Sequence, residues 1–424
     1  GVMITGLPTP PDAEDFTWPP ELAGELRGYL VEQPLASMGF GRAAHRELVK
    51  ITQHILDVQG RTALDLLGRE LWDMFFVVFT GTDRLQHRLW NYLDPNRPPN
   101  ALEDAEFFRE HLDNYYRSVD DYVGRLVEKA GPSTNCIVLS DHGFGPAPKL
   151  ALYRRALARQ LGLVAGEGVG GFHSLRAFLE RHNIVTGDRL RRMLTGTPLR
   201  RLFSRISRVA KQKEQEAWRS SQAYLVVLHK YLGGVGINLE PNDPQYEPLR
   251  SSLMEKLDAV REPNSGGRVI THVWRREEVY RGPRVRVCPD IVFRLDERYG
   301  MAHGEAPGGR LVCPKKFRSQ GIHRDEGVLT LAGPDIVTGR AESPVPIEDV
   351  SATALYLLDC ALPDDLDGEP VLDAIAPSYR DGHPVRKESA EAAEEETSVP
   401  EAQWRSIEDE DAVAEQLRDL GYLD

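Results

Sequence analysis

The chain has 424 residues, enough for two or three average domains or for one large α/β domain with insertions. Hydrophobic residues make up 41% of it and charged residues 28%, which is typical of a globular protein with a sizeable core. The 65 Asp and Glu outnumber the 52 Lys and Arg and give a net charge of -13, so we expect no binding to duplex nucleic acid. No apolar run has the length of a membrane span, so no transmembrane segment is expected. A membrane protein, a collagen-like fibre and a disordered chain are excluded.

The two ends of the chain differ in character. Residues 1–6 are an apolar, β-leaning run without an initiator methionine in first place, and we expect a fragment whose first strands are missing. A signal peptide lost with those strands would go unseen. Residues 387–411 are rich in Glu, Ala and Ser and predict a solvated acidic linker before a short helix at 412–420.

The cysteines bear on the compartment. Their wide spacing, without a CxxC pair, argues against a disulfide scaffold and against a thiolate zinc finger. Because unpaired cysteines are typical of a reducing compartment, the cytoplasm is the default location that we expect. The four residues are Cys136, Cys288, Cys313 and Cys360.

Helices and strands are predicted to alternate along much of the chain. The spacing of apolar residues predicts helices over 21–31, 42–67, 105–130 and 347–358. Apolar runs predict buried strands that begin at Met74, Cys136, Asp290 and Val328, and further strands over 2–5, 226–238 and 269–279. The order strand, long helix, strand between 74 and 139 is typical of a βαβ unit, which indicates an α/β fold.

Residues 148–222 interrupt this alternation and predict an inserted, mainly helical cap. Their GxGxxG string at 166–171 follows no convincing strand and is interpreted as a flexible loop, and their basic run at 189–213 as a solvated face. We therefore predict four segments: the first part of a metal-binding α/β core at 1–147, the cap at 148–222, the second part of the core with a small strand subregion at 223–380, and the acidic linker with its helix at 381–424.

The first candidate motif is TDRLQH, which directly follows the strand predicted at Met74. If a helix begins here, Asp83 and His87 are four residues apart and share one face. A carboxylate oxygen and an imidazole nitrogen so placed can bind one cation. The alternative is a helix-capping aspartate beside a solvated histidine.

Two further motifs lie at predicted strand ends. SDHGFG follows the strand at Cys136 and supplies Asp141 and His142; its alternative is an Asx turn with a surface histidine. GIHR lies in a predicted loop just before the strand at Val328 and supplies His323. Since ligands in open α/β sheets bind beyond the carboxyl ends of the strands, the three motifs are expected to face one crevice. Two carboxylates and three imidazoles then favour a two-metal hydrolytic site, with Zn²⁺ first and Mn²⁺ second.

Together, TDRLQH, SDHGF and GIHR followed by GVLTLAGP resemble the type I phosphodiesterase/nucleotide pyrophosphatase family of the alkaline phosphatase superfamily. The resemblance extends to VCPDIVF and DLDGEPVL further along the chain. It implies a three-layer α/β/α alkaline-phosphatase-like sheet with an inserted cap, and metal-dependent hydrolysis of phosphate mono- or diesters. By this resemblance, Asp83, His87 and His323 would hold one metal ion, and Asp141 with His142 would contribute to the other.

The sequence departs from the family before Asp83. Family members carry an aspartate there that completes the second metal site, and a Thr or Ser nucleophile. Thr5 and Thr9 follow no aspartate, while Asp12 and Asp15 lie in a proline-rich stretch. We therefore expect that the nucleophile is not in this chain and that the fragment is inactive or impaired.

The substrate is predicted only as a small-molecule phosphate ester, because specificity in such folds lies in variable loops. Arg84 and Arg324 flank metal ligands and are predicted to bind phosphate oxygens, with salt bridges as the alternative. The alternative functions are a sulfatase or a phosphoglycerate-mutase-like member of the same superfamily, and a non-catalytic metal-holding binding domain.

Overall fold

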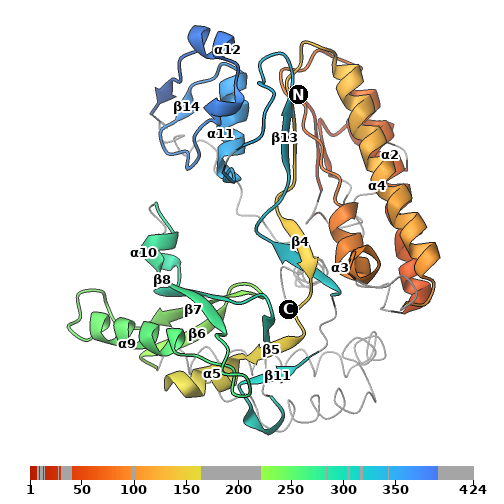
Figure 1. Cartoon of the computed structure of the whole chain (residues 1–424). Coiled ribbons are helices and arrows are strands. Elements are labelled where there is room, and N and C mark those ends of the chain that lie inside the picture. The colour runs from red at the N-terminus through yellow and green to blue at the C-terminus, as the bar shows by residue number, and fades with distance from the viewer. Residues whose placement is uncertain are drawn as a thin grey trace. The chain divides into compact units, whose positions relative to one another are not determined.

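The computed structural model describes residues 1–6, 9, 13, 15–26, 28–29, 41–96, 102–163, 221–282, 285–302, 306–315, 319–341 and 343–389. Most of the predicted cap, with its glycine-rich string and basic run, lies outside these residues, as does the helix predicted at 412–420. The chain divides into two compact units (Figure 1). Unit 1 comprises Gly1–Ala147 and Ser319–Asp424, and unit 2 comprises Pro148–Arg318.

The two units are divided at other residues than the four predicted segments. Residues 223–318, which we predicted within the second part of the core, belong to unit 2 together with residues 148–163. Their strands pair with one another and with β5 (Leu150–Tyr153), so their core is separate from that of unit 1.

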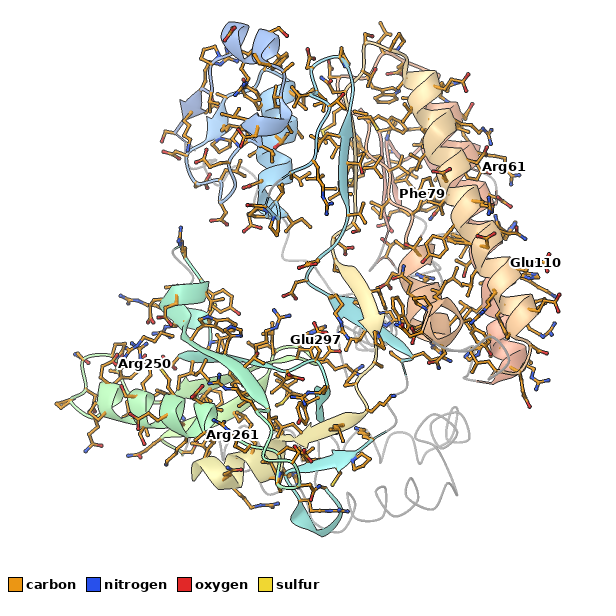
Figure 2. All side chains as sticks on the ribbon, in the orientation of Figure 1. Arg61, Phe79, Glu110, Arg250, Arg261 and Glu297 are labelled. Carbon is orange, nitrogen blue, oxygen red and sulfur yellow. The ribbon has the colours of Figure 1, made fainter. Side chains whose placement is uncertain are left out.

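Three helices form the core of unit 1: α2 (Arg42–Leu67), α3 (Gly81–Leu93) and α4 (Ala105–Ala130). The bounds of α2 and α4 agree with the prediction, because apolar side chains recur every three or four residues and give each helix one buried face. Phe79 packs on this core, whereas Arg61 and Glu110 are exposed on the helices (Figure 2). The buried cluster comprises Leu48, Val49, Leu56, Leu85, Leu89, Phe108, Leu112, Tyr115 and Tyr122.

Two antiparallel strand pairs join the part of unit 1 that follows α4 to the part that returns at residue 319. β3 (Cys136–Leu139) pairs with β13 (Leu329–Ala332), and β4 (Gly143–Pro146) pairs with β12 (Gly321–Arg324). Both strands were predicted, but their complete burial was not confirmed, because β3 is half-buried with one exposed residue and β13 alternates between half-buried and exposed residues. Such alternation is typical of antiparallel strands that are covered on one face only.

The apolar run at 74–79 is not a strand. It is a chain segment without assigned secondary structure, in which Phe76 is 70% exposed while Phe75 and Phe79 are half-buried. Side chains that alternate in this way fit an extended chain, but an apolar run forms a strand only where a neighbouring strand accepts its backbone hydrogen bonds.

Smaller elements complete unit 1. A short antiparallel pair at the start of the chain joins β1 (Met3–Ile4) to β2 (Thr17–Trp18), and of the helix predicted at 21–31 only α1 (Leu22–Glu25) is seen among the described residues. After β13 come α11 (Glu348–Leu357), β14 (Leu362–Pro363), α12 (Pro377–Gly382) and β15 (Lys387–Glu388).

The described residues of unit 2 form two sheets. The larger is antiparallel and has the order β6-β7-β9-β8, formed by Ala223–Val227, Leu232–Ile237, Ile291–Leu295 and Ile270–Arg275. In the smaller sheet β5 lies between β10 (Tyr299–Ala302) and β11 (Val312–Pro314). The helices seen in the part of unit 2 that the structure describes are α5 (Arg154–Leu161), α9 (Tyr246–Asp258) and α10 (Arg276–Val279). The mixed α/β class that we predicted is therefore confirmed, and no described helix is long and apolar enough to cross a membrane.

Asp290 is a buried charged residue that bonds to residues of β7, α9 and α10 in unit 2. It is 6% exposed and accepts hydrogen bonds from the Ile237 amide at 2.7 Å and from the Tyr246 hydroxyl at 2.6 Å. The Arg276 guanidinium lies 2.9 Å from the same carboxylate. Burial, followed by the hydrogen bond and charge of Asp290, raises the pKa of Tyr246 to about 12.

This shift predicts an alkaline weakening of unit 2. Because the folded-state pKa of Tyr246 lies above its unfolded value of about 10, the neutral phenol contributes stability that is complete below pH 10 and is lost as the pH rises toward 12. We expect the difference in unfolding free energy between the native chain and Tyr246→Phe to shrink over that range, as measured by urea denaturation at several pH values. A difference that stays constant from pH 8 to pH 12 would contradict the assignment.

Candidate metal centre

The first part of the centre is the N-terminal half of α3. The helix begins at Gly81, as the motif TDRLQH requires, so Asp83 and His87 lie one turn apart on the same face. The His87 Nε2 atom is 3.4 Å from Asp83 Oδ1. His87 is 2% exposed, which rejects the alternative of a solvated histidine.

The second part of the centre is the β4–β12 pair. GIHR was predicted as a loop, but its four residues form strand β12, because the backbone of Gly321–Arg324 pairs with β4. His323 lies directly opposite Phe144 in the register, and His142 comes two residues before Phe144. His142 lies in the bend directly before β4, and its ring centroid is 5.6 Å from that of Phe144, so this bend and the strand pair bring the side chains together.

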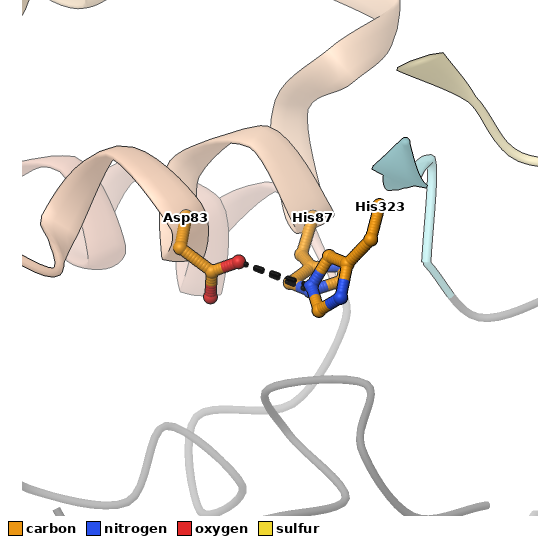
Figure 3. A group of neighbouring side chains, drawn as sticks. All are labelled: Asp83, His87 and His323. Atoms are coloured by element: carbon orange, nitrogen blue, oxygen red, sulfur yellow. Dashed lines mark hydrogen bonds and ion pairs between the residues drawn. The ribbon is translucent and has the colours of Figure 1, made fainter. Parts of the chain in front are cut away.

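Asp83, His87 and His323 meet at one point (Figure 3). The His323 Nε2 atom lies 2.9 Å from His87 Nε2 and 3.2 Å from Asp83 Oδ1. One ligand atom from each of the three residues lies within 4.8 Å of the others. His142 stacks on His323 with the ring centroids 3.7 Å apart, and its Nε2 is 3.8 Å from Asp83 Oδ1. Four of the five predicted ligands are therefore neighbours, although 240 residues separate Asp83 from His323.

Backbone carbonyls determine which imidazole nitrogens carry protons. His87 Nδ1 lies 3.1 Å from the Gly321 carbonyl oxygen, and His142 Nδ1 lies 3.1 Å from that of Gly143. A carbonyl oxygen can only accept a hydrogen bond, so both Nδ1 atoms are donors. In the neutral rings the lone pairs are then on Nε2, the atoms that face Asp83.

This donor set fits a divalent cation. The Oδ2 atom of Asp83 is buried and has no hydrogen-bond partner among the described residues, which is costly for a carboxylate oxygen. The His87 Nε2 atom lies 2.9 Å from His323 Nε2 and 3.4 Å from Asp83 Oδ1, so three candidate ligand atoms gather at one position. A cation between these atoms would satisfy them together, and a mixed nitrogen and oxygen set suits zinc or manganese.

Of the remaining predicted residues, Asp141 lies beside His142 at the exposed edge of this cluster, and the two arginines differ in burial and contacts. The Asp141 side chain is 67% exposed, and its Oδ2 is 3.5 Å from His142 Nε2. Arg84 is 5% exposed on α3. The Arg324 guanidinium donates to the carbonyl oxygens of Pro146 at 2.9 Å and of His323 at 3.3 Å.

Two glycines were missed as part of the centre. Gly143 and Gly321 supply the carbonyl groups that orient His142 and His87, and both stand inside the motifs that carry the histidines. Gly321 also permits the close approach of α3 to β12, because a Cβ atom there would lie 2.6 Å from the Gln86 carbonyl oxygen. The signal in the sequence was a glycine next to or two residues before a candidate ligand.

The family of the chain follows from comparison with known proteins. The model of the family described as type I phosphodiesterase / nucleotide pyrophosphatase matches residues 13–328, which is most of the chain. The chain belongs to this family, which is the family that its motifs resemble. No curated protein matches it.

Among solved structures, the chain is similar to phosphonoacetate hydrolase from Sinorhizobium meliloti 1021 in complex with phosphonoformate and with phosphonoacetate. Both matches have 15% sequence identity and cover 65% of this chain and 50% of the other, with TM-scores of 0.27 and 0.26. The chain therefore spans about half the length of that enzyme.

Proposed function

We propose that this protein is a metal-dependent hydrolase of phosphate mono- or diesters that uses a two-metal site. The observation that supports this proposal most is the convergence of Asp83, His87 and His323 from α3 and β12 in a chain of the phosphodiesterase family. The substrate is a small-molecule phosphate ester, and the cytoplasmic location suggested by the cysteines stays a prediction.

Asp83, His87 and His323 are proposed to hold the first cation, with Asp141 and His142 contributing to the second. Zn²⁺ suits the set best and Mn²⁺ is the second choice. When bound, such a pair supplies positive charge against the oxygens of the phosphoryl group. The role of the imidazoles is to present Nε2 lone pairs, and the Gly321 and Gly143 carbonyls hold two of the rings in the required tautomer.

Arg324 is the better placed of the two arginines proposed to bind the substrate. It follows His323 in the chain, and its guanidinium now donates to the Pro146 carbonyl oxygen, a bond that it can exchange for a charge-assisted bond to a phosphate oxygen. Arg84 is buried, so its side chain is less accessible to a substrate than that of Arg324. The nucleophile is not assigned to a residue of this sequence.

Removal of metal tests the proposal. We expect that the native gene product, treated with a chelator, loses hydrolysis of a chromogenic phosphodiester and regains it with Zn²⁺ or Mn²⁺, because the cations supply the charge that the transition state requires. Metal content is measured in parallel by mass spectrometry. Bound metal without hydrolysis would favour a non-catalytic metal-holding domain, and hydrolysis that survives complete removal of metal would contradict the proposal.

A further inference from the structure

A single aromatic ring contacts all three imidazoles of the centre. The Phe144 ring centroid lies 4.8 Å from that of His87, 5.2 Å from that of His323 and 5.6 Å from that of His142. The interplanar angles are 79°, 72° and 52°, so the imidazoles present their edges or tilted planes to the phenyl ring. Aromatic pairs prefer such tilted arrangements at these separations.

The backbone explains this central position. Phe144 is in β4 directly opposite His323 in β12, so these two side chains share one face of the strand pair, and His142 lies two residues earlier in the bend before β4. Helix α3 packs on β12 and brings His87 to the same ring. Phe144 is therefore the common neighbour of ligands from α3, from β12 and from the bend before β4.

A second aromatic side chain supports the first. The Trp90 ring lies nearly parallel to Phe144, at 26° with the centroids 6.0 Å apart, and Trp90 is one turn of α3 beyond His87. A Cβ atom at Gly321 would lie 2.9 Å from Trp90 Cβ and 3.0 Å from Phe144 Cδ1, so the backbone of β12 closes on both residues. This packing limits the movement of the phenyl ring.

The ring supplies a restraint that the hydrogen bonds do not. A bond from Nδ1 to a carbonyl fixes the position of one imidazole atom, but it leaves the ring plane free to tilt about that point. Metal ligation requires Nε2 to point at the cation within a narrow range of angle. The packed Phe144 ring contacts all three imidazoles and therefore restrains the planes of His87, His142 and His323 together.

We propose that Phe144 is a positioning residue of the metal centre: it makes no bond to the cation, and it orients His87, His142 and His323 for ligation. The inference rests on the proposed metal site. It assigns a role to the fifth residue of the SDHGF motif, which carries no group that can ligate a metal or transfer a proton.

The test uses the full chain with Zn²⁺ and Co²⁺ as probes, in three variants. Phe144→Leu keeps much of the apolar volume but removes the flat ring, Phe144→Tyr keeps the ring, and Phe107→Ala is the matched control. Phe107 is another half-buried phenylalanine of unit 1, in contact with Phe108 and His111 away from the centre. Zinc affinity is measured by competition with a chromogenic chelator, and ligand geometry by the visible spectrum of the Co²⁺ form.

We expect Phe144→Leu to weaken zinc binding by about tenfold or more, in the range known for changes beside metal ligands, and to alter the Co²⁺ spectrum. Phe144→Tyr is expected to restore both, and Phe107→Ala to leave both unchanged even if it lowers the melting temperature. Native affinity and spectrum in Phe144→Leu would overturn the positioning role, as would equal losses in Phe144→Tyr. If the native chain itself binds no metal, the proposed function fails instead.

Discussion

Replacement of His87 by alanine is expected to lower the affinity of the chain for zinc by about a hundredfold. Structural zinc sites, which have four ligands, provide about 10–16 kcal/mol, so the loss of one ligand is expected to cost about 3 kcal/mol, or roughly two powers of ten in affinity. His87 is the most buried of the candidate ligands, and its Nε2 faces both His323 and Asp83, so no solvent-exposed group can replace it at that position. Isothermal titration of the metal-free chain measures the effect.

His54→Ala is the matched control, because His54 is exposed on α2 and belongs to no candidate motif. Its zinc affinity should equal that of the native chain. Combining His87→Ala with His142→Ala should abolish both metal binding and any hydrolysis of the native gene product. Unchanged zinc affinity in His87→Ala would mean that the cluster of Figure 3 is a packed histidine pair and not a metal centre.

Replacement of Gly321 by alanine is expected to damage the centre without touching a ligand. The new Cβ would lie 2.6 Å from the Gln86 carbonyl oxygen, a backbone atom that cannot turn away, so α3 and β12 must separate. We expect a loss of about 1–3 kcal/mol in unfolding free energy, as in other overpacked sites. Zinc affinity should fall at least tenfold, because the same displacement moves the carbonyl that orients His87.

Gly124→Ala separates this effect from a general effect of replacing glycine. Gly124 lies within α4, and a Cβ there meets nothing within 4 Å. Since alanine favours a helix interior by about 0.5–1 kcal/mol over glycine, this variant should be slightly more stable and bind zinc normally. Urea denaturation and chelator competition measure both variants; normal zinc binding by Gly321→Ala would show that the contact between α3 and β12 is not needed for the centre.

Much of the helical framework could be predicted because its signals are local. The bounds of α2 and α4 agree with the apolar spacing, and α3 begins at Gly81, next to the TDRLQH motif where a helix start was considered. The convergence of Asp83, His87, His142 and His323 was predicted from the ends of predicted strands, although no strand precedes Asp83 and His323 lies within β12. Their chemistry as ligands follows from residue type, but their distances depend on the register between β4 and β12.

What could not be predicted depends on pairing between distant segments. GIHR forms a strand because β4, about 180 residues earlier, offers it a partner, and the run at 74–79 remains without a strand despite its strong apolar character. The exposure of Asp141 and the contacts of Phe144 likewise follow from the path of the chain at the start of β4. Sequence patterns predict which residues prefer a strand, but not which segment will lie beside it.

The position of unit 2 in the chain has a consequence for how such a protein can diverge. The chain leaves unit 1 after Ala147 and returns at Ser319. The Ala147 amide donates to the Gln320 carbonyl oxygen at 2.9 Å, which continues the antiparallel pairing of β4 with β12. The 171 residues of unit 2 are therefore inserted where a hairpin would have its turn. We call this inserted segment the cassette. The fold of unit 1 requires only that the two ends of the cassette lie one strand spacing apart. The cassette can therefore be exchanged or enlarged through evolution or engineering while the histidines keep their register.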